Sequence, residues 1–305
     1  MKRFLENIVA NFKLPIALIL LAVCVVFWIP AFISSWAAAL PAMILCAGNA
    51  VLLMKICYKA NITRMYSALP VLVYFLVFSA QGSLVTNWRV QLLALFLMLS
   101  VLLVVLVYRS DKAMKEMFLL TLLLSAASLV TPEALLMIPL FWLYMFIQQS
   151  MNIRVFLASV IAIAIFAIYY VFEMNVLETP LIIDWQALLQ RHVFSAEPLL
   201  FAYVVVSLCF TVYFIVSLFS GFSRCNIYTQ SYISVFSMPA VLAILLVVYC
   251  SNLLLSLAWL LTPMAALALL CFLQKKTVLN GVIFLTWLLT YLGFGIYDTV
   301  TYFIL

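Results

Sequence analysis

The stretch LPIALILLAVCVVFWIPAFI, residues 14–33, decides the fold class of this chain. It contains no charged residue, and its length matches the ~20 residues that a helix needs to cross the ~30 Å hydrocarbon core of a bilayer. The run QLLALFLMLSVLLVVLVY at residues 91–108 has the same character. Neither run alternates with the period of two that a strand would show, so both predict transmembrane helices.

The composition agrees with a membrane protein. The chain has 305 residues, of which 70% are hydrophobic and 8% are charged, whereas a soluble domain is about 45–50% apolar and about 25% charged. A globule of this size would still need a polar surface. The excess of apolar residues therefore predicts an all-α, polytopic transmembrane helical bundle that forms one integral membrane domain over residues 1–305.

Eleven apolar segments are predicted to span the membrane, and the first of them is expected to stay uncleaved. We place the spans near residues 14–33, 36–54, 66–81, 91–108, 117–131, 133–147, 155–172, 198–220, 234–250, 253–273 and 279–295. The longest stretch between two spans follows the seventh one. This division leaves no room for a separate soluble domain.

The basic residues support this count and predict an orientation. With the N-terminus in the cytoplasm and the C-terminus outside, only Arg89 and Arg191 of the 15 basic residues fall on the external side. This is the asymmetry that the positive-inside rule describes. The rule also accounts for the formal net charge of +6, so we predict membrane lipids and no nucleic acid as partners.

The first candidate site is the predicted turn at Thr131, Pro132 and Glu133. Its two arms, 117–131 and 133–147, are about 15 residues or ~22 Å long, which is less than the hydrocarbon thickness. We therefore expect Glu133 in a recess on the external side, at the positive end of the second helix dipole, as a candidate catalytic group. The alternative is an ordinary wet turn in which Thr131 and Glu133 only cap the helix.

The second candidate site is the external segment after the seventh span. Residues 182–193 have one apolar and one polar face, which predicts a helix in the membrane interface with Trp185 in the headgroup layer. Arg191 and His192 could hold a phosphate or pyrophosphate, with His192 as a second catalytic candidate. Alternatively, the polar side chains of this helix only touch headgroups. Further candidate substrate-binding residues on this side are Asp184, Glu178 and Arg89.

No sequence pattern calls for a cofactor or a metal. His192 is the only histidine, the seven cysteines include no CxxC pair and no Walker motif occurs, so we predict no cofactor and no metal site. Serines and threonines inside the spans are expected to bond to helix backbones. Asp298 lies just beyond the last predicted span, and we expect it to be solvated.

The segment SLVTPEAL at residues 128–135, followed by an apolar run, Arg154 and another apolar run, resembles a stretch of a family of bacterial inner-membrane proteins without an assigned activity. This resemblance implies a multi-pass protein of the bacterial inner (cytoplasmic) membrane. The same stretch is more loosely similar to the middle of polyprenyl-dependent polytopic glycosyltransferases. That similarity implies catalysis at the external face, although such enzymes carry acidic residues in a sizeable first external loop, and the loop near Ser34 and Ser35 has none.

Three functions fit these observations. The first is a membrane glycosyltransferase or ligase that handles a polyprenyl- or glycolipid-linked cell-envelope substrate at the external face. The second is a transporter or lipid flippase, which requires a polar cavity near Asn49, Gln81 and Ser128, although the low glycine content of six residues argues against broken helices. The third is a non-catalytic subunit or scaffold of an envelope complex that binds a membrane protein partner.

Overall fold

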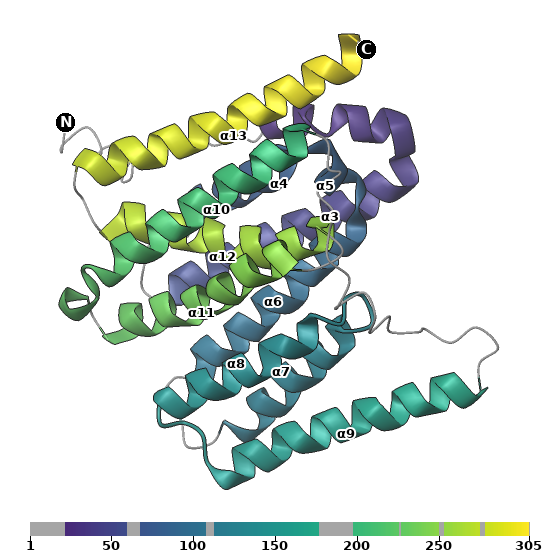
Figure 1. Cartoon of the computed structure of the whole chain (residues 1–305), viewed down its shortest axis with the longest axis vertical. Helices are drawn as coiled ribbons and strands as arrows, with labels where there is room; N and C mark the ends of the chain where they lie inside the picture. Colours follow the sequence, from purple (N-terminus) through teal and green to yellow (C-terminus); the bar gives the residue numbers. More distant parts are fainter. Residues whose placement is uncertain are drawn as a thin grey trace.

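A computed structural model shows the chain as a bundle of packed helices (Figure 1). The structure describes residues 22–59, 68–107, 113–176, 198–225, 227–249, 253–274 and 278–304. Within these ranges every regular element is helical and no strand occurs. The predicted all-α class is therefore confirmed.

The helices follow one another with short connections where the structure describes them. A helical stretch at residues 22–26 comes first. The α-helices after it are α3 (Ile29–Lys59), α4 (Leu69–Ser79), α5 (Gly82–Thr86), α6 (Trp88–Val107), α7 (Met114–Ala127), α8 (Ala134–Ile147), α9 (Ile153–Val176), α10 (Pro198–Phe219), α11 (Ile227–Tyr249), α12 (Leu253–Gln274) and α13 (Val278–Ile304). A short 3-10 helix, η2 (Phe222–Arg224), lies between α10 and α11.

Seven of the described helices are long and apolar enough to cross a membrane. They are α3, α6, α9, α10, α11, α12 and α13. The other four are shorter, with 11 residues in α4, 5 residues in α5 and 14 residues in each of α7 and α8. By the length and composition of its helices, the chain is a multi-pass membrane protein.

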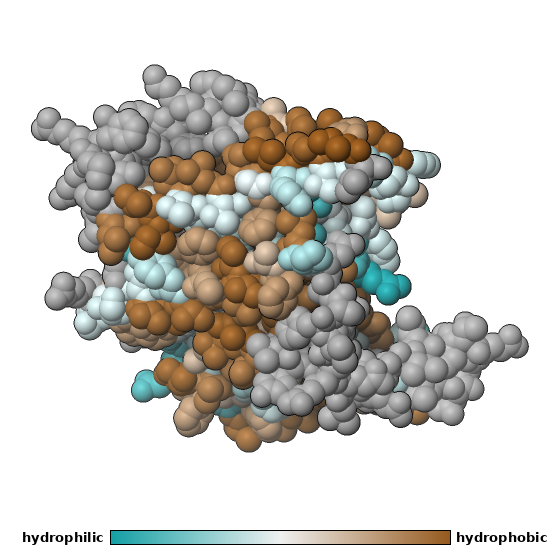
Figure 2. Space-filling view, turned by 45° about the horizontal axis from the view of Figure 1, so that its top comes forward, coloured by the Kyte–Doolittle hydropathy of each residue, from teal (hydrophilic) through white to brown (hydrophobic). Residues whose placement is uncertain are grey.

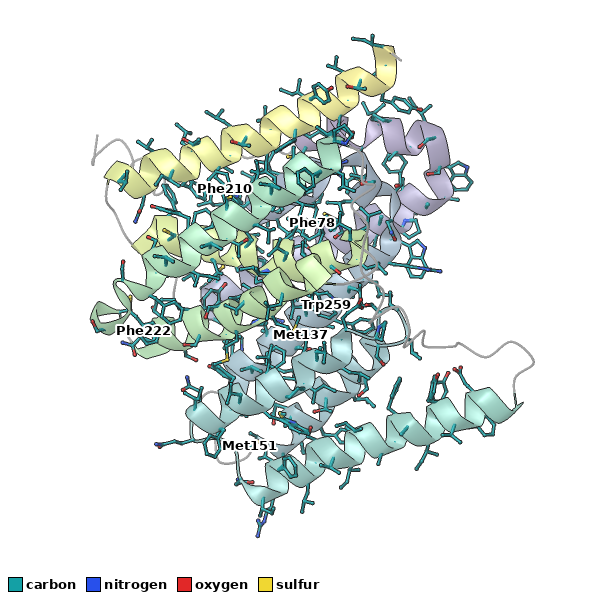
Figure 3. All side chains as sticks on the ribbon, viewed as in Figure 1. Phe78, Met137, Met151, Phe210, Phe222 and Trp259 are labelled. Carbon is teal, nitrogen blue, oxygen red and sulfur yellow. The ribbon has the colours of Figure 1, made fainter. Side chains whose placement is uncertain are left out.

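Helix α12 forms the centre of the bundle. It contacts α11, α10, α6 and α4, and 94% of its most apolar window is buried inside the protein. The side chains of Trp259 and Thr262 are fully buried, and the interior position of Trp259 is labelled in Figure 3 together with that of Phe78 from α4. The surroundings of α12 are therefore protein, although its composition would also suit lipid.

Helices α7, α8 and α9 occupy the side of the bundle opposite α13 (Figure 1). Ser159 of α9 joins the three, because its Oγ lies 2.7 Å from Thr121 Oγ1 of α7 and accepts a 2.7 Å hydrogen bond from Trp142 Nε1 of α8. The C-terminal half of α9 stands apart from the bundle, and its large side chains Ile168 and Phe172 are exposed. The hydrogen bonds of Ser159 thus anchor the first half of α9 to α7 and α8.

The predicted turn at Ser34 and Ser35 is a bend inside α3 in the structure. Ser35 has non-helical backbone angles (φ −159°, ψ 73°), and helical residues continue on both sides of it. At the other end of the chain, α13 continues to Ile304 and so passes the predicted end at residue 295. Asp298, which was expected beyond the last span, lies within this helix.

Helix α4 covers most of the predicted span at residues 66–81, and the chain breaks at the predicted end of that span before a short helix, α5, follows. Helix α4 ends at Ser79, Gln81 is extended (φ −139°, ψ 118°), and α5 begins at Gly82. Side chains from other elements bond to the break: Tyr203 Oη donates to the carbonyl of Val77 at 2.7 Å, and Trp28 Nε1 donates to Ser79 Oγ at 2.8 Å. The bond from Tyr203 supplies a partner for a backbone carbonyl near the break, and the bond from Trp28 ties the Ser79 side chain to the rest of the bundle.

The surface of the bundle is largely apolar. In the view of Figure 2, brown residues cover most of the described surface, and the strongest teal patches lie toward the left and right margins. A hydrophobic belt between two hydrophilic margins is the surface that a bilayer requires.

Candidate functional site

The turn between α7 and α8 closes a short helical hairpin. The N–H of Thr131 donates to the carbonyl of Ala127 at 3.1 Å, and the N–H of Ala134 donates to the carbonyl of Thr131 at 3.2 Å. Each arm has 14 residues, which is about 21 Å at 1.5 Å per residue and falls short of the ~30 Å hydrocarbon core. The hairpin is therefore as short as the sequence predicted.

Glu133 is buried at the tip of this hairpin. Its side chain is 3% exposed, and that of Thr131 is 2% exposed. Glu133 directly precedes α8, but no side-chain capping bond is formed at this helix end. The alternative of a solvated capping turn is therefore wrong, since both side chains are out of water. The carboxyl group lies next to the positive end of the α8 dipole, which favours its negative charge, and its predicted catalytic role stays a prediction.

Arg89 lies exposed at the start of α6. Its backbone N–H donates to Asn87 Oδ1 at 3.1 Å, and its Cζ lies 5.9 Å from the ring centroid of Trp88. The ribbon places the start of α6 and the α7–α8 turn on the same margin of the bundle (Figure 1). Arg89 is thus accessible to an anionic group on the margin where Glu133 is buried, and its predicted binding role stays a prediction.

The other predicted site residues belong to a part of the chain for which no structure is described. These are Glu178, Asp184, Arg191 and His192, together with the predicted interfacial helix at residues 182–193, which lie outside the described residues. Their proposed contact with a phosphate stays a prediction. Within the described ranges, no group of three or more His, Cys, Asp or Glu side chains is arranged to hold a metal ion.

Asp298 is a polar contact that the sequence did not predict. Its Oδ2 accepts a 2.8 Å hydrogen bond from the backbone N–H of Gly82, the first residue of α5. A Cβ atom at residue 82 would lie 2.7 Å from that oxygen, so only glycine allows the approach. Asp298 is half-buried, so its carboxylate bonds to the first residue of α5 while part of it stays exposed. No local signal in the sequence links residues so far apart.

A second unpredicted feature is a polar cluster among α3, α4 and α6. Asn49 Nδ2 donates to the carbonyl of Gln91 at 2.9 Å, and Tyr74 Oη donates to Gln91 Oε1 at 3.4 Å. All three side chains are fully buried. Asn49 therefore joins two helices. The sequence does contain one indication of this cluster, because Asn49 and Gln91 each place an amide side chain within an apolar run. Such groups commonly form hydrogen bonds to neighbouring helices in a membrane.

The serines and threonines inside the helices behave as the sequence predicted. Thr121, Thr262, Thr286 and Thr290 each donate to the carbonyl four residues earlier, at 2.8 to 2.9 Å. Ser128 donates to the carbonyl of Ser125 at 2.6 Å. These hydroxyl groups form hydrogen bonds with carbonyl groups of their own helices and do not indicate a ligand site.

Comparison with known proteins gives no match for this chain: no protein-family model, no curated protein and no solved structure is similar to it. The site is therefore defined by its own geometry, which is a buried carboxyl group at the tip of a short hairpin with an exposed arginine on the same margin.

Proposed function

We propose that this chain handles a lipid-linked cell-envelope substrate, of the polyprenyl or glycolipid class, at the external face of the bacterial inner membrane. In this proposal it has eleven spans and a cytoplasmic N-terminus, and Glu133 exchanges a proton with the substrate as in a membrane glycosyltransferase or ligase. The observation that carries the proposal is the burial of Glu133 at the tip of a hairpin whose arms are shorter than the hydrocarbon core is thick. A carboxyl group at membrane depth is rare without a functional reason.

The chemistry of the margin supports the same proposal. A lipid-linked phosphate needs a cation at the interface and an apolar path for its chain. Arg89 supplies an exposed guanidinium group within the described residues, and Arg191 and His192 would supply the rest. The apolar residues on the face seen in Figure 2 would accommodate the chain.

The test is a photo-reactive polyprenyl phosphate added to the full-length protein in nanodiscs, with the labelled peptides identified by mass spectrometry. We expect labelling at the α7–α8 turn, and we expect Glu133→Gln to change the yield at least fivefold (about 1 kcal/mol). Glu116→Gln is the matched control, because Glu116 lies in the first turn of α7, at the other end of that helix. Labelling confined to other helices, or equal effects of the two variants, would contradict the proposal.

A transporter or lipid flippase is the second candidate, and the broken helix α4–α5 favours it. Transporters use such breaks at their binding sites, and Gln81, 2% exposed, has no hydrogen-bond partner for its Oε1 in the structure. Fluorescent-lipid scrambling in proteoliposomes tests this candidate. Loss of scrambling in Gln81→Leu but not in the control Gln148→Leu, at the C-cap of α8, would support the transporter or flippase. Absence of scrambling by the unchanged protein would exclude it.

A further inference from the structure

A groove between the first turns of α7 and α9 combines an apolar wall with two cations. It has a volume of about 540 Å³, which is within the range of about 300–1,000 Å³ for ligand sites. Lys115 lies in the first turn of α7 and Arg154 in the first turn of α9, and both line the groove. The rest of the lining is apolar, with Phe118 and Leu119 from α7 and Leu157 and Ile161 from α9.

The packing below the groove holds its walls in place. Val155 and Ala158 of α9 are buried against the bundle, and Ser159 bonds to both Thr121 and Trp142. Asn152 Oδ1 accepts the N–H of Val155 at 3.0 Å and so caps α9. The first turn of α9 is therefore fixed relative to α7. The walls above this floor are open to the surroundings, since Leu119, Leu157 and Ile161 are 46%, 50% and 54% exposed.

Lys115 and Arg154 lie at helix ends whose dipoles disfavour a positive charge. The N-terminal end of a helix carries partial positive charge, so a basic side chain in the first turn opposes the dipole. Both α7 and α9 begin at this groove, and each places a basic side chain there. An anion between Lys115 and Arg154 would offset two repulsive arrangements at once. Glu116 also lies in the first turn of α7, but it does not line the groove.

We infer that this groove binds one anionic phospholipid, with its phosphate between Lys115 and Arg154 and an acyl chain along the apolar walls. Charge complementarity selects the headgroup, and the open apolar walls select a membrane lipid over a soluble anion. The described basic side chains Lys55 and Lys59 at the end of α3 fit the same leaflet, because α3 ends on the margin where α9 begins (Figure 1). The site lies at the opposite end of α7 from Glu133 and does not depend on the function proposed above.

Native mass spectrometry of the full-length protein tests this inference. The protein is titrated in detergent with phosphatidylglycerol and, separately, with phosphatidylcholine of the same acyl chains. We expect phosphatidylglycerol to bind at least tenfold more tightly than phosphatidylcholine. The variant Lys115→Gln/Arg154→Gln should bind phosphatidylglycerol about tenfold or more weakly, because each cation near an anionic lipid contributes measurably to binding. The matched control Lys55→Gln/Lys59→Gln removes the same charge from the same margin and should lose less than threefold.

A second pair of variants tests the acyl-chain half of the inference without changing charge. Leu157→Trp places a larger ring in the groove and should weaken binding of phosphatidylglycerol about fivefold or more. Val160→Trp is the control, since Val160 is exposed on α9 but does not line the groove. Equal affinity for the two lipids, equal losses in the charge variant and its control, or equal effects of the two tryptophans would overturn the inference. Thermal unfolding of each variant shows whether it is folded.

Discussion

Helices α12 and α9 are both strongly apolar, but they have opposite surroundings. Each contains a 21-residue apolar segment, and α9 is the more apolar of the two by mean hydropathy. Yet 94% of the α12 window is buried in protein, against 22% for α9. In a membrane both protein and lipid are apolar, so hydropathy does not separate a core helix from a lipid-facing one. The difference arises from packing, and it can be tested residue by residue.

The largest effect is expected in the centre of α12. Trp259 is fully buried, so Trp259→Ala should leave a large cavity and lower the free energy of unfolding by about 3–5 kcal/mol. Phe172→Ala on α9 is the comparison, because that ring is 59% exposed, and it should cost less than about 0.5 kcal/mol. Unfolding in mixed micelles, followed by circular dichroism, measures both. Similar losses would mean that α9 is as enclosed as α12.

A pair of glycines sharpens the comparison within one peripheral helix, α13. A Cβ at Gly295 would lie 2.5 Å from Cε2 of the buried Phe27 ring, whereas a Cβ at Gly293 would meet nothing within 4 Å. Gly295→Ala should therefore destabilise the protein by about 1–3 kcal/mol through overpacking, and Gly293→Ala should be neutral or slightly stabilising because alanine favours helices. Equal changes in the unfolding midpoint of the two variants would show that α13 does not pack on residue 27.

The anchor of α9 should give a smaller effect. Ser159→Ala removes the hydroxyl that lies 2.7 Å from both Thr121 Oγ1 and Trp142 Nε1. Interhelical hydrogen bonds in membranes are worth about 0.6 kcal/mol each on average, so we expect a loss of about 1–2 kcal/mol. Thr286→Ala is the control, because Thr286 is exposed and bonds to Val282 of its own helix. Disulfide trapping between α7 and α9 would reveal the expected loosening.

The smallest effect is expected where α9 leaves the bundle. Ile168 is 70% exposed, and Ile168→Ala should change the free energy of unfolding by less than about 0.5 kcal/mol. The same substitution is measured in protein extracted under gentle conditions and in protein after harsh delipidation. If Ile168→Ala lowers the free energy of unfolding by more than about 2 kcal/mol in the first preparation only, a partner covers this half of α9. That outcome would favour the non-catalytic subunit or scaffold over the enzyme.

The candidate site was predictable only in part. Thr131, Pro132 and Glu133 mark a turn between two short apolar arms, and this local pattern was enough to predict the hairpin that the structure contains. The burial of Glu133 could not be read from this local pattern, because it depends on neighbouring elements, and the predicted recess stays a prediction. The bond between Gly82 and Asp298 was not predictable, because it joins two distant parts of the chain.

The sequence by itself determined the class of this protein. Long uncharged runs such as 91–108 must be helical and surrounded by apolar material, because lipid offers no partner for an open backbone. Tertiary structure decided the rest: that α12 lies inside and α9 outside, that a short helix, α5, follows the break at Gln81, and that Lys115 and Arg154 share one groove. The physical reason is that hydropathy reports transfer out of water, whereas helix contacts in a membrane depend on shape and on hydrogen bonds between residues far apart in the chain.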